Sequence, residues 1–154
     1  MVERARLEVD VVKAIRVPVP PAFLRGLLRR AAQVPEVDAR LPAGSATIAL
    51  RLTTDGELRR LNHDFAGKDS VTDVLSFAGL GQHLGDLAIS WPAVLRQSQE
   101  FGEPEQTELG LLTVHGLLHL LGWDHETAAE RNEMTRITLA ALALSGLKIS
   151  PGRL

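Results

Sequence analysis

The stretch SATIALRLTTDGELRRLNHDF, residues 45–65, holds two kinds of secondary structure in direct succession. Residues 45–53 alternate apolar and polar side chains and include β-branched residues, which predicts a strand. Thr54 and Glu57 form a capping box, with Thr54 as the N-cap, and this predicts a helix that runs to about Phe65. A strand joined this closely to a helix indicates a sheet that is covered by helices.

The rest of the chain repeats this mixture. Further strands are predicted at residues 7–12, 72–77 and 86–91. Further helices are predicted from Pro20–Pro21 up to Pro35, which ends that helix, and at residues 92–102, 104–121 and 126–144. The expected fold is therefore α+β, or mixed α/β, with a single small mixed β-sheet of about four strands covered by about five helices. At 154 residues, the chain has the length of one domain, residues 1–154.

The chain contains no cysteine. This excludes a disulfide framework, a thiolate zinc site and a cysteine nucleophile, so a transition-metal site must be built from His, Asp and Glu. No run of about 18 apolar residues is present to span a membrane. The charged N-terminal residues lead straight into the first predicted strand, without the apolar stretch of a signal peptide. We therefore expect a soluble protein of the cytoplasm that has no membrane partner.

The net charge of −2 argues against the basic surface of a nucleic-acid binder, but it averages two unlike halves. Residues 1–68 hold 12 Lys and Arg against 8 Asp and Glu, whereas residues 69–154 hold 5 against 11. If the fold brings the basic half beside a site in the acidic half, a cationic surface borders that site. The basic side chains concerned are Arg25, Arg29, Arg30, Arg59, Arg60 and Lys68.

The segment HGLLHLLGWDH, residues 115–125, holds three of the five histidines of the chain. His115 and His119 are four residues apart, so they lie one turn apart on the same helix face and can converge on one ion. Gly122 can adopt a positive φ and end the helix, which lets the chain turn back and present His125. Three neutral imidazoles with one open position are typical of a catalytic zinc site.

Other interpretations of these histidines remain open. They can be core or surface groups with ordinary hydrogen bonds, or they can hold a structural metal with Asp124 as a fourth ligand. The spacing also matches the metzincin proteases, H-E-x-x-H-x-x-G-x-x-H, including the glycine. However, Gly116 stands where those enzymes carry the glutamate that acts as general base. The sequence thus predicts a protease-like metal site without the protease's carboxylate.

Three segments together resemble the bacterial YbeY family. HGLLHLLGWDH resembles its signature H-G-x-L-H-L-x-G-[YF]-D-H, with Trp123 at the aromatic position. LNHDFAGKDSVTDVLSF, residues 61–77, resembles its L-N-x-x-[YF]-R-x-K-D-x-P-T-[DN]-V-L-S-F. LGDLAIS, residues 84–90, resembles its L-G-D-[IL]-x-I-S. Three motifs in the right order, in a chain of fitting length, make the resemblance specific.

This resemblance implies a single-strand-specific, metal-dependent endoribonuclease of the cytoplasm. Such a protein acts in maturation of the 3′ end of the small-subunit ribosomal RNA and in ribosome quality control. The metal, usually one Zn²⁺ although other divalent metals also suit imidazoles, is assigned to His115, His119 and His125, where it activates water or a phosphoryl oxygen. The implied partners are single-stranded and ribosomal RNA, the small ribosomal subunit and its assembly factors, with no DNA expected.

The sequence departs from the family pattern at Ala66, where the family carries an arginine thought to help catalysis or RNA binding. Positive charge for RNA is then expected from Lys68, Arg59 or Arg60, although none of these need reproduce the geometry of that arginine. Ser76 is a further candidate for RNA binding. Because this arginine is absent at position 66, a second function also remains open, that of a non-catalytic ribosome-assembly factor with a structural metal. A metallopeptidase-like metal hydrolase is the other alternative.

Candidates for a catalytic role beyond the metal ligands are Asp124, Glu108 and Lys68. Glu108 lies seven residues before His115 and therefore on the same helix face. It is expected either to orient a ligand imidazole or to be a solvated acid in the first turn of the helix. Asp124 is expected to fix the turn or to orient a histidine.

Overall fold

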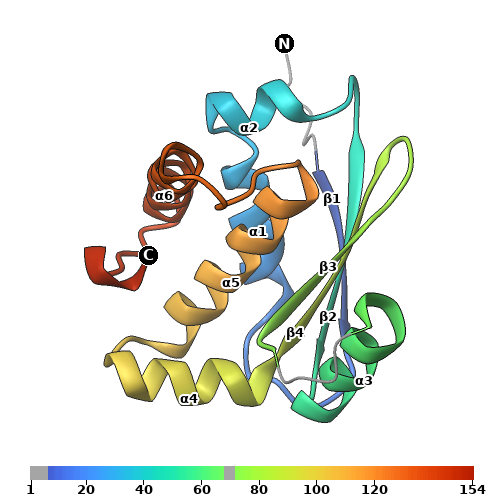
Figure 1. The fold of residues 1–154 in the computed structure, drawn as a ribbon, viewed down its shortest axis with the longest axis vertical. Coiled ribbons are helices and arrows are strands. Elements are labelled where there is room, and N and C mark those ends of the chain that lie inside the picture. The colour runs from blue at the N-terminus through green and yellow to red at the C-terminus, as the bar shows by residue number, and fades with distance from the viewer. Residues whose placement is uncertain (1–6, 68–71) are drawn as a thin grey trace.

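The computed structural model of this chain describes residues 7–67 and 72–154 (Figure 1). Its four-stranded sheet has the order β1-β2-β4-β3, in which β1, β2 and β4 run parallel and β3 pairs antiparallel with β4. The sheet is therefore mixed, and the predicted fold class is confirmed. The strands are β1 (Leu7–Lys13), β2 (Ala46–Thr53), β3 (Val74–Ala78) and β4 (His83–Ser90).

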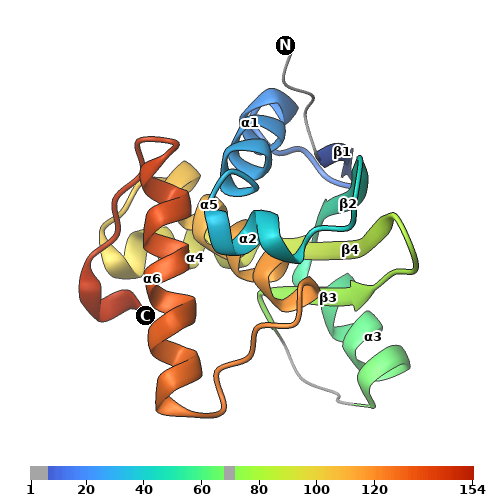
Figure 2. The same cartoon turned by 90° about the horizontal axis from the view of Figure 1, so that it is seen from above.

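The helices cover the two faces of the sheet unequally. α1 and α5 pack on one face with α6 outside them, and α3 packs on the other face (Figures 1 and 2). No helix in the described part of the chain is both long and apolar enough to cross a membrane. The helices are α1 (Pro21–Ala31), α2 (Pro35–Arg40), α3 (Asp55–Ala66), α4 (Trp91–Phe101), α5 (Glu105–Leu120) and α6 (Ala128–Ala143), with a 3₁₀ turn at Pro151–Arg153.

The alternation that predicted β2 decides which face of the sheet is buried. Ile48, Leu50 and Leu52 are almost fully buried in the core between the sheet and the α1–α5 layer, whereas the intervening Arg51 is exposed. The next element begins as the capping box predicts, because the Thr54 hydroxyl accepts a hydrogen bond from the backbone N–H of Glu57 at 3.2 Å. The central helix, α5, is apolar around most of its circumference, as expected for a helix covered by α1, α4, α6 and the sheet.

The structure differs from the sequence prediction at a few element boundaries. α1 already ends at Ala31, and Pro35 begins the short helix α2 instead of ending α1, because a proline fits the first helical turn, where no N–H partner is needed. Strand β4 already begins at His83, three residues before the predicted start, and it includes Gly85 with a φ of 149°. Trp91 belongs to α4 and not to the strand, since the Ser90 hydroxyl caps that helix.

Candidate metal centre

Two of the three motif histidines are held by α5, whose C-terminal end has the geometry that the sequence predicted. Gly122 follows the helix with a φ of 94°. Its N–H donates to the carbonyl of His119 at 3.0 Å, and the N–H of Trp123 donates to the carbonyl of Leu118 at 3.0 Å. These two bonds form a Schellman motif, which reverses the chain immediately after His119.

Trp123 and Asp124 fix the segment that follows this reversal. The Trp123 ring is buried, lies under the Arg40 guanidinium at 3.7 Å, and donates from Nε1 to Glu133 at 3.0 Å. The Asp124 carboxylate accepts a hydrogen bond from the backbone N–H of His125 at 2.7 Å. Asp124 thus holds the turn that presents His125, while its participation in the reaction stays a prediction.

The three histidines converge. One ligand atom from each of His115, His119 and His125 lies within 4.8 Å of the others, and among the described residues this is the one group of its kind. The ring centroids are 5.1 Å apart for His115 and His119, and 5.3 Å apart for His119 and His125. Since the first two rings are half-buried and the third is exposed, the cluster is open on one side.

The surroundings of the cluster favour neutral imidazoles. Burial, followed by the neighbouring His119 and His125, lowers the pKa of His115 to about 4. Burial also lowers the pKa of His119, whose ring is oriented by a hydrogen bond with the Trp123 backbone. Neutral imidazoles bind divalent transition metals, and an oriented ring is typical of a metal ligand. The donor set of this site therefore fits such an ion, with one coordination position left open.

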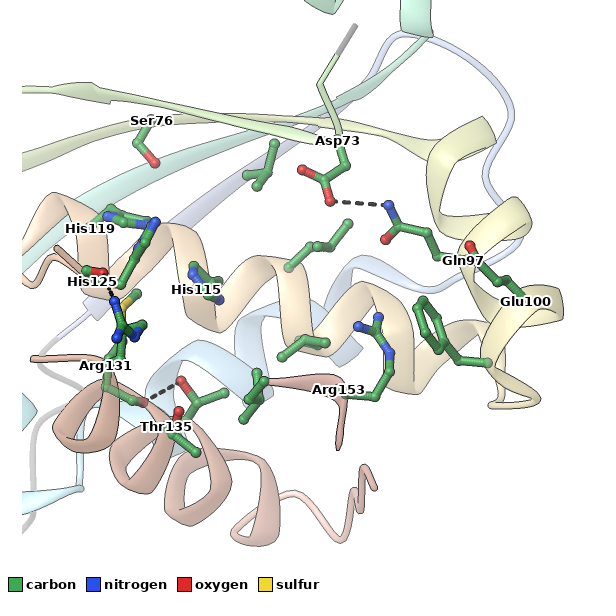
Figure 3. A pocket seen from close by; sticks show the side chains of 17 residues that line it. Asp73, Ser76, Gln97, Glu100, His115, His119, His125, Arg131, Thr135 and Arg153 are labelled. Carbon is green, nitrogen blue, oxygen red and sulfur yellow. Dashed lines mark hydrogen bonds between the residues drawn. The ribbon is translucent and has the colours of Figure 1, made fainter. Parts of the chain in front are cut away.

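The open side of the cluster faces a pocket of about 680 Å³ (Figure 3). Its walls come from β3, α4, α5, α6 and the C-terminal segment. Asp73 accepts a hydrogen bond from Gln97 at 3.1 Å in one wall, while the Ser76 hydroxyl points into the pocket from β3. The remaining polar lining residues are Glu100, Arg131, Thr135, Thr138 and Arg153.

Comparison with known proteins agrees with this geometry. The family model described as Endoribonuclease YbeY matches residues 19–144. The chain belongs to the YbeY family.

Individual members of the family are similar over much of their length. An Endoribonuclease YbeY of Chloroflexus aggregans is 49% identical over 112 residues, which cover 65% of this chain and 72% of that protein. One of Alkalilimnicola ehrlichii is 42% identical over 155 residues, covering 92% of this chain and 87% of the relative. The solution structure of TM1509 from Thermotoga maritima matches 94% of this chain with a TM-score of 0.60 at 21% identity, which supports the fold.

Glu108 lies in an environment that the sequence did not predict. Its side chain is fully buried and accepts a hydrogen bond from Arg153, which lies beyond the part of the chain that matches the YbeY family model. The interpretation of Glu108 as a solvated acid is therefore wrong. Burial raises the pKa of Glu108, and Arg153 opposes that rise. The alternative role, orientation of a ligand imidazole, stays a prediction, because the carboxylate is bound to Arg153.

The basic residues proposed from the sequence do not gather at the pocket. Arg59 and Arg60 belong to α3, on the face of the sheet opposite α5, and neither lines the pocket (Figure 1). Arg60 pairs with Glu57 at 3.3 Å. Lys68 lies outside the described residues. Of the four RNA-binding candidates, Ser76 is the one that the described structure places in the pocket wall.

The arginines of α1 are also engaged elsewhere. Arg25 and Arg29 donate to the backbone carbonyls of Val9 and Leu7, and Arg30 donates to Ser145 at 2.7 Å. The cationic border expected from residues 1–68 is therefore not built by these side chains. The pocket instead takes its arginines from the acidic half of the chain, at positions 131 and 153. No short motif marks either position in the sequence.

Gly116 shows why the YbeY cluster does not mimic a protease site. A Cβ atom at this position would lie 2.8 Å from Cδ2 of Leu87 in β4. The residue therefore faces the sheet rather than the pocket, and helix α5 needs a glycine there to approach β4 closely.

Proposed function

We propose that this chain is a metal-dependent endoribonuclease that cleaves single-stranded RNA, with one Zn²⁺ held by His115, His119 and His125. The observation that carries the proposal is the convergence of these three imidazoles in the wall of a pocket, with the open side of the cluster facing it. Membership of the YbeY family, whose curated members are named endoribonucleases, supports RNA as the substrate. Other divalent ions suit the same donors.

The residues around the site have distinct parts in this proposal. His115 and His119 remain unprotonated at neutral pH because burial lowers their pKa values, so they are available as ligands. When bound, the ion supplies a Lewis acid for phosphodiester chemistry. The Ser76 hydroxyl, in the opposite wall, can donate to a phosphate oxygen. Either water or the RNA 2′-hydroxyl serves as the nucleophile.

The biological setting proposed for this activity is the cytoplasm. There the protein acts in maturation of the 3′ end of the small-subunit ribosomal RNA and in ribosome quality control, together with the small subunit and its assembly factors. Its family membership supports this setting. A peptidase is less well supported, since Gly116 stands at the position of the protease glutamate and faces the sheet rather than the pocket. An assembly factor with a structural metal is disfavoured by the open side of the cluster.

The experiment that tests the proposal compares three proteins on three substrates. Metal-loaded wild type, His119→Ala and the control His63→Ala are incubated with single-stranded RNA, double-stranded RNA and casein, each with and without chelator. His63 is an exposed residue of α3 that contacts Asp64, outside the cluster. We expect cleavage of single-stranded RNA by wild type and His63→Ala, sensitivity to chelator, and no cleavage by His119→Ala. Casein cleavage would support the peptidase, and inactivity with intact ribosome binding would support the assembly factor.

A further inference from the structure

The charge around the pocket is uneven. Among the described residues that line it, Arg131 and Arg153 are the two with a permanent positive charge, whereas Asp73 and Glu100 are acidic. RNA brings one negative charge per nucleotide, so a pocket that holds it needs a cation with free hydrogen-bond donors. The two arginines differ in whether they can provide them.

The Arg153 side chain already binds partners within the protein. Its guanidinium pairs with the fully buried Glu108 and lies 3.8 Å from the centre of the Phe101 ring. Only 10% of its side chain is exposed. Moving this group onto a phosphate would leave a buried carboxylate without its counterion, which is costly. Arg153 therefore holds the C-terminal segment against α5 and is unsuited to bind substrate.

Arg131 has the opposite properties. It is exposed, lies in the first turn of α6, and forms no ion pair with any residue that the structure describes. Its Nη1 donates one hydrogen bond, at 3.3 Å, to the backbone carbonyl of the metal-ligand candidate His125. A guanidinium has five N–H donors, so this bond leaves most of them available.

The helix α6 directs Arg131 toward the pocket. Met134, Thr135 and Thr138 follow it at spacings of three, four and seven residues, and all of them line the same pocket. Residues at these spacings share one helix face. Figure 3 shows the Arg131 side chain between His125 and Thr135, on the side of the histidines. The guanidinium is thus beside the proposed metal and at the edge of the space that a substrate enters.

We propose that Arg131 binds a phosphate group of the RNA strand next to the three histidines. The inference rests on the proposed function, since it takes RNA as the occupant of the pocket. A planar guanidinium can bind two phosphate oxygens at once, which fixes the position of the strand as well as its charge. Arg131 is then the positioning residue that sets which phosphate lies at the metal.

The test uses a matched arginine on the same helix. Arg136 is also exposed, but it pairs with Glu36 of α2 and does not line the pocket. Arg131→Ala and Arg136→Ala change the net charge equally, so their difference reports position rather than charge. Binding of a fluorescent single-stranded RNA is measured with chelator-treated protein at several salt concentrations. Zn²⁺ affinity and the kcat and KM of cleavage are measured on the same variants.

We expect Arg131→Ala to weaken RNA binding by at least about tenfold, the loss typical of a charge-assisted hydrogen bond. The slope of log affinity against log salt should become shallower by about 0.7, one phosphate contact on a single strand. Arg131→Lys should keep the slope and recover only part of the affinity. Arg136→Ala should bind like wild type, and all four proteins should bind Zn²⁺ equally.

Two results would overturn the inference while leaving the proposed function intact. One is RNA binding and cleavage by Arg131→Ala that match those of Arg136→Ala. The other is loss of Zn²⁺ affinity in Arg131→Ala. That result would mean that Arg131 holds His125 in place through the hydrogen bond to the His125 carbonyl, instead of binding RNA. If wild type neither binds nor cleaves single-stranded RNA, the proposed function and the inference both fail.

Discussion

Arg153 donates a hydrogen bond to Glu108 across 45 positions of the sequence, at a point where the Glu108 side chain has no exposure to solvent. The second carboxylate oxygen of Glu108 and Nε of Arg153 have no hydrogen-bond partner among the described residues. Arg153 and Phe101 both line the pocket, so the attraction of Arg153 to Glu108 and its contact with Phe101 hold this part of the pocket wall in place. A buried pair of this kind is more costly to break than to replace.

Removal of Arg153 alone should destabilise the protein strongly. Arg153→Ala leaves Glu108 as a buried carboxylate without a counterion, which costs about 3–5 kcal/mol in comparable pairs. The pKa of Glu108, already raised by burial, should rise further without the arginine that opposes the rise. Urea unfolding at pH 7 measures the free energy of unfolding. The double variant Glu108→Met, Arg153→Met should recover most of the loss, and a single variant as stable as wild type would contradict the prediction.

Local patterns made a large part of the site predictable. His115 and His119 share a helix face because of their spacing, and Gly122 ends that helix because it can adopt a positive φ. Both facts depend on residues within one or two turns of each other. The strands and helices were predictable for the same reason, since each carries its own periodicity, whereas the mixture of parallel and antiparallel strands depends on pairing between separate segments.

The surroundings of the histidines were not predictable from the sequence, because they depend on contacts between distant segments. Arg131 reaches the pocket only through the packing of α6 on α5, and Arg153 reaches it only through the C-terminal segment. Arg59 and Arg60 are near a family motif in the sequence. However, they belong to α3, and the sheet lies between α3 and the α5 side of the molecule, where the pocket is. Sequence proximity therefore does not place Arg59 and Arg60 in the pocket wall, and their binding of RNA stays a prediction.

Metal binding should stabilise the folded protein. An ion that binds only the folded state adds about 2.7 kcal/mol when its concentration is 100 times its Kd, which corresponds to a rise in Tm of roughly 5–10 °C for a chain of this size. Thermal unfolding with and without Zn²⁺ measures the shift. His125→Ala should lose most of it. His83→Ala should keep it, because His83 lies on β4 and contacts Thr47 and Asp86 instead. Equal shifts in all three proteins would contradict the assigned ligands.

The stability of the metal-free protein should fall as the pH is lowered from about 6.5 to about 4. The unfolded chain takes up a proton at His115 near its ordinary pKa of 6.5, whereas the folded protein does so only near 4. Between these values the unfolded state binds more protons, so lower pH favours unfolding. Chelator-treated wild type and His115→Gln are unfolded by urea across this range. The variant should show a shallower decline, and parallel profiles would contradict the lowered pKa.

A methyl group at position 116 should disturb the packing of α5 against the sheet. In Gly116→Ala the new Cβ would lie 2.8 Å from Leu87 Cδ2, so the leucine or the helix must move, at a cost of about 1–3 kcal/mol. The matched control is Gly56→Ala in α3, where the nearest atom to an added Cβ is the Thr54 hydroxyl oxygen at 3.9 Å. That change should be neutral or stabilising, because alanine favours a helix over glycine by roughly 1 kcal/mol.

The same geometry predicts the outcome of restoring the protease sequence. Gly116→Glu should not produce a peptidase, because a side chain at this position is directed at Leu87 and away from the pocket. We expect this variant to be less stable than Gly116→Ala, since it places a carboxylate against the apolar contact between α5 and β4. Urea unfolding compares the two, and casein hydrolysis is assayed with Zn²⁺ present. Chelator-sensitive casein cleavage by Gly116→Glu would show that the glycine, rather than the orientation of the helix, keeps this site from acting on peptides.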